Sequence, residues 1–428
     1  MLFGYIPDAA NDHFAALIGQ LSQQFQAASL RASAQITIDP ELDLYDLTPG
    51  GVLDTLFGTG PKAADVVEID SLLLGALVQR NWLQPPSVEI PGILPSALQA
   101  ASIAGVAYGV PTYLCSNVIY AHTNDLGSAG DGPALLRLLS SLSPSKPALV
   151  GNYKGSWILP SAYLDAWADT NGTAGLAGAY RPPVDPRAMG SFRPLVRSCA
   201  SGAANPCLDG TYATGTQAET AFATREANGF VGFTERLFYI LSAVPRPLPS
   251  VISAPLGLGS QPVMFVDLLV VNRHCTQSCL ANATAFIRFM SRLSTRNLIA
   301  FSQDAPPGAI PRYLLQANSA FYSGPLAQAD PFYPQYWRFI QGAVPYPNQG
   351  FPEDRLVLGT AVKDALAAAP AADEHRPAAG DVSRTRPGTF DHQIRVPGQP
   401  GPGREDVSHL QVESAGERRP TSRARRRA

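Results

Sequence analysis

The sequence has few charged residues, few cysteines and no hydrophobic run long enough to cross a membrane. Charged residues make up 15% of the 428 residues and the formal net charge is -2, so the charge balance gives no reason to expect binding to nucleic acid or to a membrane. The apolar run at 263–271 is far shorter than the roughly 20 residues of a transmembrane helix and is interrupted by Asp267. With 45% hydrophobic residues, the composition predicts a globular protein with a sizeable core and a small-molecule partner. Nothing in it indicates a partner chain, and we expect a monomer.

The cysteines number only five, and four of them form two close pairs in sequence. Cys199 lies near Cys207 and Cys275 near Cys279, which leaves Cys115 without a local partner. A bridge between Cys275 and Cys279 would close a very short loop, so these two could instead be reduced or paired with Cys199 and Cys207. The unpaired Cys115 is either a nucleophile in a cleft or a small apolar residue that fills a gap in the core.

Close cysteine pairs and two glycosylation sequons, at Asn171 and Asn282, predict an oxidising compartment and therefore a secreted protein. The first residues, MLFGYIPD, contain neither a basic n-region nor an apolar h-region. We therefore expect that the signal peptide is missing from this sequence, either because the gene model is truncated or because the sequence is that of the mature protein. The alternative is an intracellular protein with five reduced thiols and chance sequons.

Apolar segments alternate with turn residues at lengths that suit strands and helices in turn, which predicts an α/β protein. Residues 2–6 read as a strand and 12–29 as a helix with apolar residues at helical spacing. Residues 65–70 read as a buried strand that ends in Asp70 and is followed by a helix at 72–77. Because ligands of open α/β sheets lie at the carboxyl ends of strands, Asp70 is a candidate ligand contact.

The amino-acid composition changes near residue 366. Residues 367–428 are rich in Pro, Gly, Arg, Ser and Glu and contain a single Phe, so they cannot bury enough apolar surface to offset chain entropy. We expect a disordered C-terminal tail. Its basic end could bind nucleic acid or act as a nuclear signal, but beside a secreted body a solvated tail is the simpler interpretation.

The order of these parts resembles the periplasmic-binding-protein-like (type II) fold, in which two α/β lobes close around a ligand in an interlobe cleft. By this resemblance, the extended segment at 108–111 and the apolar run at 263–271 are crossings between the lobes, and Cys115 lies at the cleft. The implied organisation is as follows: 1–112, first part of lobe 1; 113–265, lobe 2; 266–312, return to lobe 1; 313–366, C-terminal helices packing on lobe 2; 367–428, tail.

A more specific resemblance covers roughly residues 1–355. Successive blocks of the chain resemble thiaminase I, also called thiamine pyridinylase, in the same order. The blocks are 67–74 (VEIDSLLL), 108–117 (YGVPTYLCSN), 155–167 (GSWILPSAYLDAW), 232–236 (GFTER) and 334–352 (PQYWRFIQGAVPYPNQGFP). The resemblance implies a secreted transferase that replaces the thiazole of thiamine with a base or thiol.

The resemblance also implies the catalytic residues. Cys115 matches the cysteine that forms a covalent adduct with the pyrimidine ring of thiamine, and Glu235 matches the catalytic glutamate. A thiol with its ordinary pKa is mostly protonated at neutral pH, so an adjacent carboxylate is needed as the base. The implied partners are thiamine and a small nucleophile as co-substrate, and the chemistry requires no metal or organic cofactor.

Thiamine carries an aminopyrimidine and a cationic thiazolium, so its pocket should offer carboxylates and aromatic faces. The candidates for substrate binding are Asp70, Asp267, Tyr5, Tyr45 and Tyr113. Asp267 is the strongest, because an ionised side chain inside an apolar run is costly unless it is paired or faces a site. Asp70 could be only a helix N-cap, and the tyrosines could be packing residues.

The chain departs from the family pattern at Phe233 and Phe265, where the family tends to have tyrosine, so two hydroxyls that could bond the ligand are absent. This leaves room for a thiamine analogue as the true substrate.

Three other interpretations stay open. Glu235 could be a surface residue that pairs with Arg236. Cys115 and His122 could form a protease-like pair, although no oxyanion motif accompanies them. The whole chain could be a non-catalytic solute-binding protein for thiamine or a similar small cation.

Overall fold

The computed structural model describes residues 2–3, 6–29, 34–39, 42–200, 204–213, 215–244 and 247–368. The chain divides after Ala369, and the second unit, Pro370–Ala428, lies outside the described residues. The predicted tail, apart from residues 367–368, and the candidate Tyr5 therefore also lie outside them.

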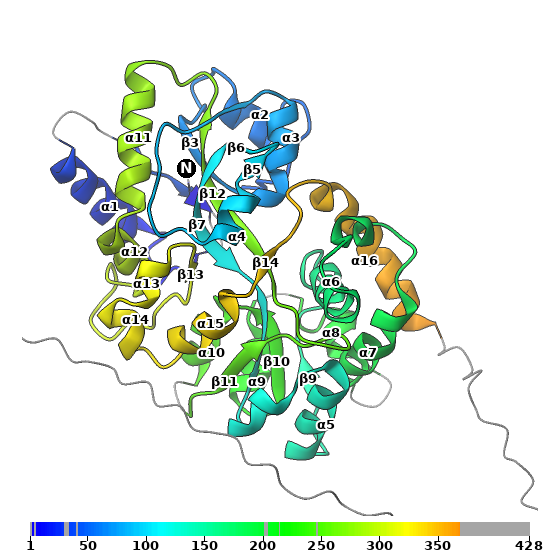
Figure 1. The fold of residues 1–428 in the computed structure, drawn as a ribbon. Coiled ribbons are helices and arrows are strands. Elements are labelled where there is room, and N and C mark those ends of the chain that lie inside the picture. Colours follow the sequence, from blue (N-terminus) through cyan, green and yellow to red (C-terminus); the bar gives the residue numbers. More distant parts are fainter. Residues whose placement is uncertain are drawn as a thin grey trace, which may run out of the picture. The chain divides into compact units, whose positions relative to one another are not determined.

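Lobe 1 is built around β12 (Val263–Asn272), which lies inside its sheet (Figure 1). This apolar strand is buried along its whole length. β12 pairs antiparallel with both β3 (Val66–Asp70) and β7 (Gly109–Cys115), and in the described part of the chain they belong to a sheet of 6 strands. Leu269 and Val271 of β12 face one hydrophobic cluster, with α1 (Ala15–Ala28) and α11 (Ser278–Met290). Leu268 and Val270 face another, with α3 (Leu74–Gln79). Burial on both faces explains why the strand is a nearly continuous hydrophobic run.

The lobe 1 elements are β1 (Leu2–Phe3), α1 (Ala15–Ala28), β2 (Ile38–Asp39), α2 (Val52–Phe57), β3 (Val66–Asp70), the 3-10 helix η1 (Ser71–Leu73), α3 (Leu74–Gln79), β4 (Leu83–Gln84), α4 (Pro95–Ala100), β5 (Ser102–Ile103), β6 (Val106–Ala107), β7 (Gly109–Cys115), β12 (Val263–Asn272), α11 (Ser278–Met290), α12 (Leu293–Ala300), β13 (Leu315–Gln316), α13 (Ser319–Tyr322), α14 (Pro325–Ala329) and β14 (Val344–Pro345).

Lobe 2 has its own sheet, with strands in the order β11-β8-β10-β9, and helices packed around it. Its elements are β8 (Asn117–Ala121), η2 (Asn124–Ser128), α5 (Gly132–Leu142), β9 (Leu149–Val150), α6 (Ile158–Asn171), η3 (Leu176–Tyr180), α7 (Pro186–Arg197), α8 (Pro206–Asp209), α9 (Gln217–Ala223), β10 (Gly229–Phe233), α10 (Arg236–Ala243) and β11 (Ser250–Ser253). Two later helices pack on this lobe, α15 (Tyr333–Ile340) on β11 and α16 (Phe351–Ala367) on α6 and α7.

The chain passes between the sheets at places other than the expected ones. β7 ends at Cys115 in the sheet of lobe 1 and β8 begins at Asn117 in that of lobe 2, so the first passage is at Ser116. The expected crossing at 108–111 instead leads into β7, and 263–271 lies within β12. β7 continues past Pro111, through a register shift between Val266 and Leu268 of β12.

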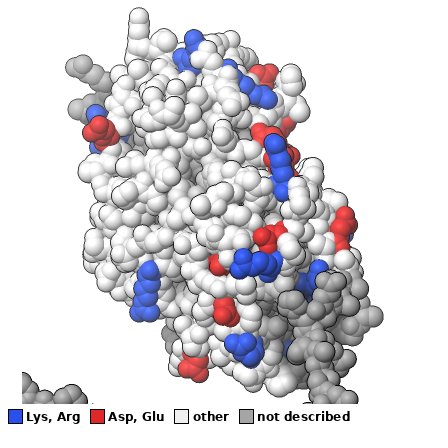
Figure 2. Space-filling view, turned by 45° about the vertical axis from the view of Figure 1, so that its right-hand side comes forward, with Lys and Arg blue, Asp and Glu red and all other residues white. Residues whose placement is uncertain are grey.

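Both local disulfides are formed, which excludes the alternative pairings. Cys199 is bonded to Cys207 and Cys275 to Cys279, and their Cα atoms are 6.2 and 5.2 Å apart. Cys115 is free. No helix among the described residues is long and apolar enough to span a bilayer. On the face shown in Figure 2, the charged side chains are sparse and of both signs.

Candidate active site

Cys115 is the last residue of β7 and lies where the two sheets meet. Its Cα partner in β12 is Phe265, and the next residue, Ser116, donates a hydrogen bond from Oγ to the Val263 carbonyl at 2.8 Å. Both flanking strands are therefore fixed, while the Cys115 side chain is only partly buried. The thiol is held by rigid elements and still has access to a ligand.

Glu235 approaches this thiol from lobe 2. It follows β10, whose last residue, Phe233, is the Cα partner of Asn117 at the start of β8. Because Asn117 is two residues after Cys115, this register brings the end of β10 to the end of β7. The Cys115 Sγ lies 3.7 Å from the Glu235 Oε2, across a sequence separation of 120 residues. The structure thus brings together the two residues to which the resemblance gives catalytic roles.

The backbone before Glu235 is fixed by two tyrosine hydroxyls. Tyr120 donates to the Thr234 carbonyl at 3.1 Å, and Tyr336, whose hydroxyl is 2.7 Å from that of Tyr120, lies 3.5 Å from the same carbonyl. Arg236 does not form the ion pair with Glu235 that the sequence left open. Its guanidinium pairs with Glu219 and packs over the ring of Tyr239.

Two buried aspartates from lobe 1 face the same region. Asp70 ends β3, Asp267 interrupts β12, and the two are Cα partners in the antiparallel pair. Asp267 sits at the register shift, opposite an extra residue of β7, and its carbonyl accepts a bond from the Thr112 hydroxyl at 3.0 Å. β-bulges are common beside active sites because they redirect a side chain. Asp70 also caps η1 through the Leu72 N–H at 2.9 Å, so the N-cap interpretation holds alongside the ligand one.

Burial and like charges shift the acid–base behaviour of this cluster. Burial raises the pKa of the Cys115 thiol well above its usual value, and the negative charges of Glu235, Asp267 and Asp70 raise it further. Burial also raises the pKa of Glu235, although Arg236 partly opposes this. The pKa of Asp70 is raised to about 7 by burial, against the lowering effect of its hydrogen bonds. Burial and the neighbouring negative charges therefore favour the protonated form of the Cys115 thiol in the free protein, and the acidic group that contacts its sulfur is Glu235.

Tyr45 joins the two lobes beside Asp70. Its hydroxyl donates to Asp70 Oδ2 at 3.1 Å, and its ring lies 4.4 Å from that of Trp157, which precedes α6 of lobe 2. The Arg355 guanidinium of α16 packs over both rings, at 4.5 Å from the Trp157 centroid and 5.6 Å from that of Tyr45. Neither Trp157 nor Arg355 was among the predicted site residues, although Trp157 lies in the block at 155–167 that resembles thiaminase I.

Phe233 and Phe265 pack edge to face, with ring centroids 5.7 Å apart. Phe265 also lies 4.4 Å from the ring of Tyr346. The wall beside Cys115 is therefore apolar at the two positions where the family tends to have hydroxyls.

Asp165 of α6 is a buried carboxyl group that the sequence analysis missed. Asn117 Nδ2 lies 2.6 Å from its Oδ2, and the Tyr346 hydroxyl lies 2.8 Å from its Oδ1. Burial raises the pKa of Asp165 to about 8. This residue links α6 to the strand that follows Cys115 and to the ring that packs on Phe265. Asp165 lies within an apolar helix as Asp267 lies within an apolar strand, so the same argument from the cost of a buried charge could have selected it.

Tyr113, a candidate for substrate binding, and His122, a candidate partner of Cys115, both lie in other surroundings. Tyr113 is 1% exposed in the cluster with α1 and α11, where the Arg296 guanidinium packs 4.8 Å from its ring, so its surroundings are those of a packing residue. His122 follows β8, about 17 Å beyond Asn117 along an extended strand, and stacks on Phe222 at 4.6 Å. This position argues against a Cys–His pair.

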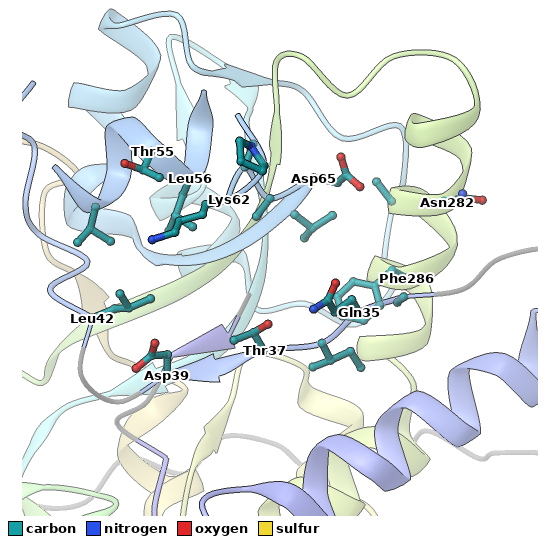
Figure 3. A pocket seen from close by; sticks show the side chains of 18 of the residues that line it. Gln35, Thr37, Asp39, Leu42, Thr55, Leu56, Lys62, Asp65, Asn282 and Phe286 are labelled. Atoms are coloured by element: carbon teal, nitrogen blue, oxygen red, sulfur yellow. The ribbon is translucent and has the colours of Figure 1, made fainter. Parts of the chain in front are cut away.

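Two cavities differ in their relation to the site. A cavity of about 220 Å³ in lobe 2 is lined by Glu235 and Phe233. A larger one, of about 790 Å³, lies in lobe 1 between α2, the start of β3 and α11 (Figure 3). Its lining includes Lys62, Asp65 and Phe286 but neither Cys115 nor Glu235, so the smaller cavity is the one that adjoins the candidate chemistry.

No family model matches the chain. In sequence it is 24% identical over 357 residues to Thiaminase-1 of Paenibacillus thiaminolyticus, covering 79% of this chain and 80% of the relative. In structure it is similar to Clostridium botulinum thiaminase I in complex with thiamin, with a TM-score of 0.65 and 17% identity, covering 86% of this chain and 99% of the other. It is also similar to maltose-bound T. maritima MalE3, with a TM-score of 0.63 and 14% identity, covering 86% and 96%. The two-lobed periplasmic-binding-protein-like fold is thereby confirmed, and so is the resemblance of this chain to thiaminase I.

Proposed function

We propose that the chain is a thiamine-degrading transferase of the thiaminase I type, with Cys115 as nucleophile and Glu235 as base. The observation that carries the proposal is the 3.7 Å contact between the Cys115 sulfur and the Glu235 carboxylate where the lobes meet. The likeness in fold to both thiaminase I and a maltose-bound protein fits an enzyme or a binding protein equally well. A thiol placed against a buried carboxylate is the feature that a binding protein does not need.

The proposed reaction begins with addition of the Cys115 sulfur to the pyrimidine ring of thiamine, while the thiol proton passes to Glu235. The bond between the bridging methylene and the thiazolium nitrogen then breaks, and its electron pair leaves with the thiazole. A nucleophile forms a new bond to the methylene. The carbon–sulfur bond finally breaks, and the sulfur recovers its proton from Glu235.

The carboxylates explain how a thiol with a raised pKa becomes reactive. In the free protein, three acidic residues oppose formation of the thiolate. A bound thiazolium brings a positive charge that offsets them, so the substrate itself lowers the cost of ionising Cys115. Asp70 and Asp267 are proposed as the contacts of the cationic substrate, with the Tyr45 ring as an aromatic face.

The proposal extends to the state of the protein. The two disulfides support secretion, since such bonds persist in oxidising compartments. The protein is also proposed to be a monomer. Lobe 1 is proposed to comprise the chain up to Cys115 and again from Val263, except for α15 and α16, which belong with the segment between these two parts to lobe 2.

Base exchange by the purified protein tests the proposal. Thiamine is incubated with aniline or pyridine, and both the exchange product and free thiazole are followed by mass spectrometry. We expect wild-type protein to form both, and Cys115→Ser to form neither while binding thiamine with similar affinity. Glu89→Gln, an exposed change away from the site, serves as the matched surface control and should behave as wild type. Thiamine binding by the wild type without any consumption would support the solute-binding alternative instead.

A further inference from the structure

Arg355, near the start of α16, carries a charge that no acidic side chain pairs with directly. It is partly buried, and none of the ion pairs between described residues involves it. Its Nη1 donates to the Pro352 carbonyl at 2.6 Å, whereas its Nε is buried and has no hydrogen-bond partner among the described residues. Because a buried donor without a partner is destabilising, this placement of the guanidinium needs an explanation.

Two aromatic rings, one from each lobe, hold the guanidinium in place. It lies 4.5 Å from the centroid of Trp157 and 5.6 Å from that of Tyr45, and the two rings are 4.4 Å apart. An aromatic face attracts a guanidinium and the organic cation of a ligand by the same cation–π interaction. The ring faces that Arg355 covers are therefore, in their chemistry, a site for a cation.

The same place is within electrostatic reach of the two lobe 1 carboxylates that are proposed to contact the thiazolium. The Tyr45 hydroxyl donates to Asp70 Oδ2 at 3.1 Å. Burial raises the pKa of Tyr45 well above its usual value, the charges of Asp70 and Asp267 raise it further, and the charge of Arg355 opposes the rise. A cation beside the Tyr45 ring is thus attracted by both carboxylates, whether it belongs to the protein or to a ligand.

From these features we propose that Arg355 occupies the place of the substrate's cationic ring in the free protein, and that the bound thiazolium displaces its guanidinium. The inference rests on the proposed function and adds an internal competitor to it. The thiazolium takes over the ring faces of Tyr45 and Trp157, and the displaced Nε gains water as a partner. Leu356 and Val357, the next residues of α16, are 59% and 57% exposed, so a long, flexible side chain beside them can move its head into solvent without movement of the helix.

Ligand binding by Arg355 variants in a Cys115→Ser background tests the inference. The ligands are thiamine and an analogue in which a neutral ring replaces the thiazolium, and Kd is measured by titration calorimetry. With Arg355→Gln, we expect the Kd of both ligands to fall by a similar factor of about 2 to 30, because neither ligand then has to break a cation–π contact. Arg355→Lys keeps the charge and should stay closer to its parent. Lys363→Gln removes a positive charge from an exposed position of the same helix and, as the matched control, should change neither Kd.

Three results would overturn the inference. If Arg355→Gln lowers the Kd of thiamine alone, the guanidinium stays in place and merely repels the thiazolium. If it raises the Kd of either ligand, Arg355 contacts the ligand or holds the lobes together. If it changes neither Kd, Arg355 lies outside the space that the ligand fills.

Nuclear magnetic resonance provides a second readout that does not depend on the folding of Arg355→Gln. In the Cys115→Ser protein labelled with ¹⁵N-arginine, the Nε–H signal of Arg355 is the one that Arg355→Lys removes. We expect this proton to exchange with water faster once thiamine is bound, and slower or unchanged exchange would contradict displacement. If the wild type binds thiamine but never consumes it, the proposed function fails while the Kd comparison still decides this inference.

Discussion

Asp70→Asn should weaken binding of a cationic ligand while leaving binding of a neutral ligand of the same shape nearly unchanged. Asn is nearly isosteric with Asp and also serves as an N-cap, so the bond to the Leu72 N–H that starts η1 can persist. The change removes one of the two carboxylates that β3 and β12 place side by side. It therefore tests charge with little disturbance of the fold.

The magnitude follows from Coulomb's law. Opposite unit charges about 4 Å apart attract by about 1 kcal/mol in water and about 4 kcal/mol at an effective dielectric constant of 20. For the buried Asp70 we expect a loss between these limits, which is a rise in Kd of about 10- to 100-fold at pH 8. Because burial raises the pKa of Asp70 to about 7, the wild type itself loses this charge as the pH falls. At pH 6 the difference between wild type and variant should be several-fold smaller.

Isothermal titration calorimetry in a Cys115→Ser background measures this without turnover. The ligands are thiamine and an analogue in which the thiazolium is replaced by a neutral ring, and exposed Asp125→Asn is the control for loss of one acidic residue. Equal affinity of the variant and its parent for thiamine at pH 8 would refute the reasoning. An equal loss for the neutral analogue would show that Asp70 acts only through the cap of η1.

Two further predictions concern the other buried acids. Glu235→Gln should lower kcat about 10²- to 10⁴-fold, which is the usual contribution of a general base. In the wild type, kcat should fall at acidic pH as Glu235 is protonated, at a pH above the ordinary pKa of glutamate because burial raises the pKa of Glu235. The variant should lack this acidic fall in kcat. Asp165→Asn should flatten the pH dependence of stability, as measured by urea unfolding at pH 5 and 8.5. Between its ordinary value of 3.8 and about 8, folded Asp165 keeps a proton that the unfolded chain loses, so wild-type stability falls as pH rises through this window, by on the order of 1 kcal/mol or more. A variant that loses as much stability as the wild type over that range would show that Asp165 is ionised in the folded state.

The fold and the pairing of Cys115 with Glu235 could be predicted from the sequence for different reasons. Alternation of apolar segments and turns predicted the α/β class, and β3 and α1 lie close to their expected ranges because burial on one or both faces leaves a clear period. The approach of Glu235 to Cys115 has no such local signal. It depends on the register of β10 against β8, which is set by the whole sheet, and only the ordered blocks of the resemblance pointed to it.

Asp165 could also have been predicted as a site or support residue from the energetic cost of burying a charge. The argument that selected Asp267, a carboxylate within an apolar strand, applies equally to LPSAYLDAW of α6, because a helix that is apolar on every side is buried. Leu164 and Ala166 on either side of Asp165 are completely buried, and so the carboxyl needs the partners that Asn117 and Tyr346 provide. Arg355 had no comparable signal, because an arginine on a C-terminal helix is an ordinary surface residue. Its guanidinium lies over Trp157 only because α16 packs against α6. Buried acids in apolar segments are therefore predictable as site or support residues, whereas a cation that reaches the site from another helix is not.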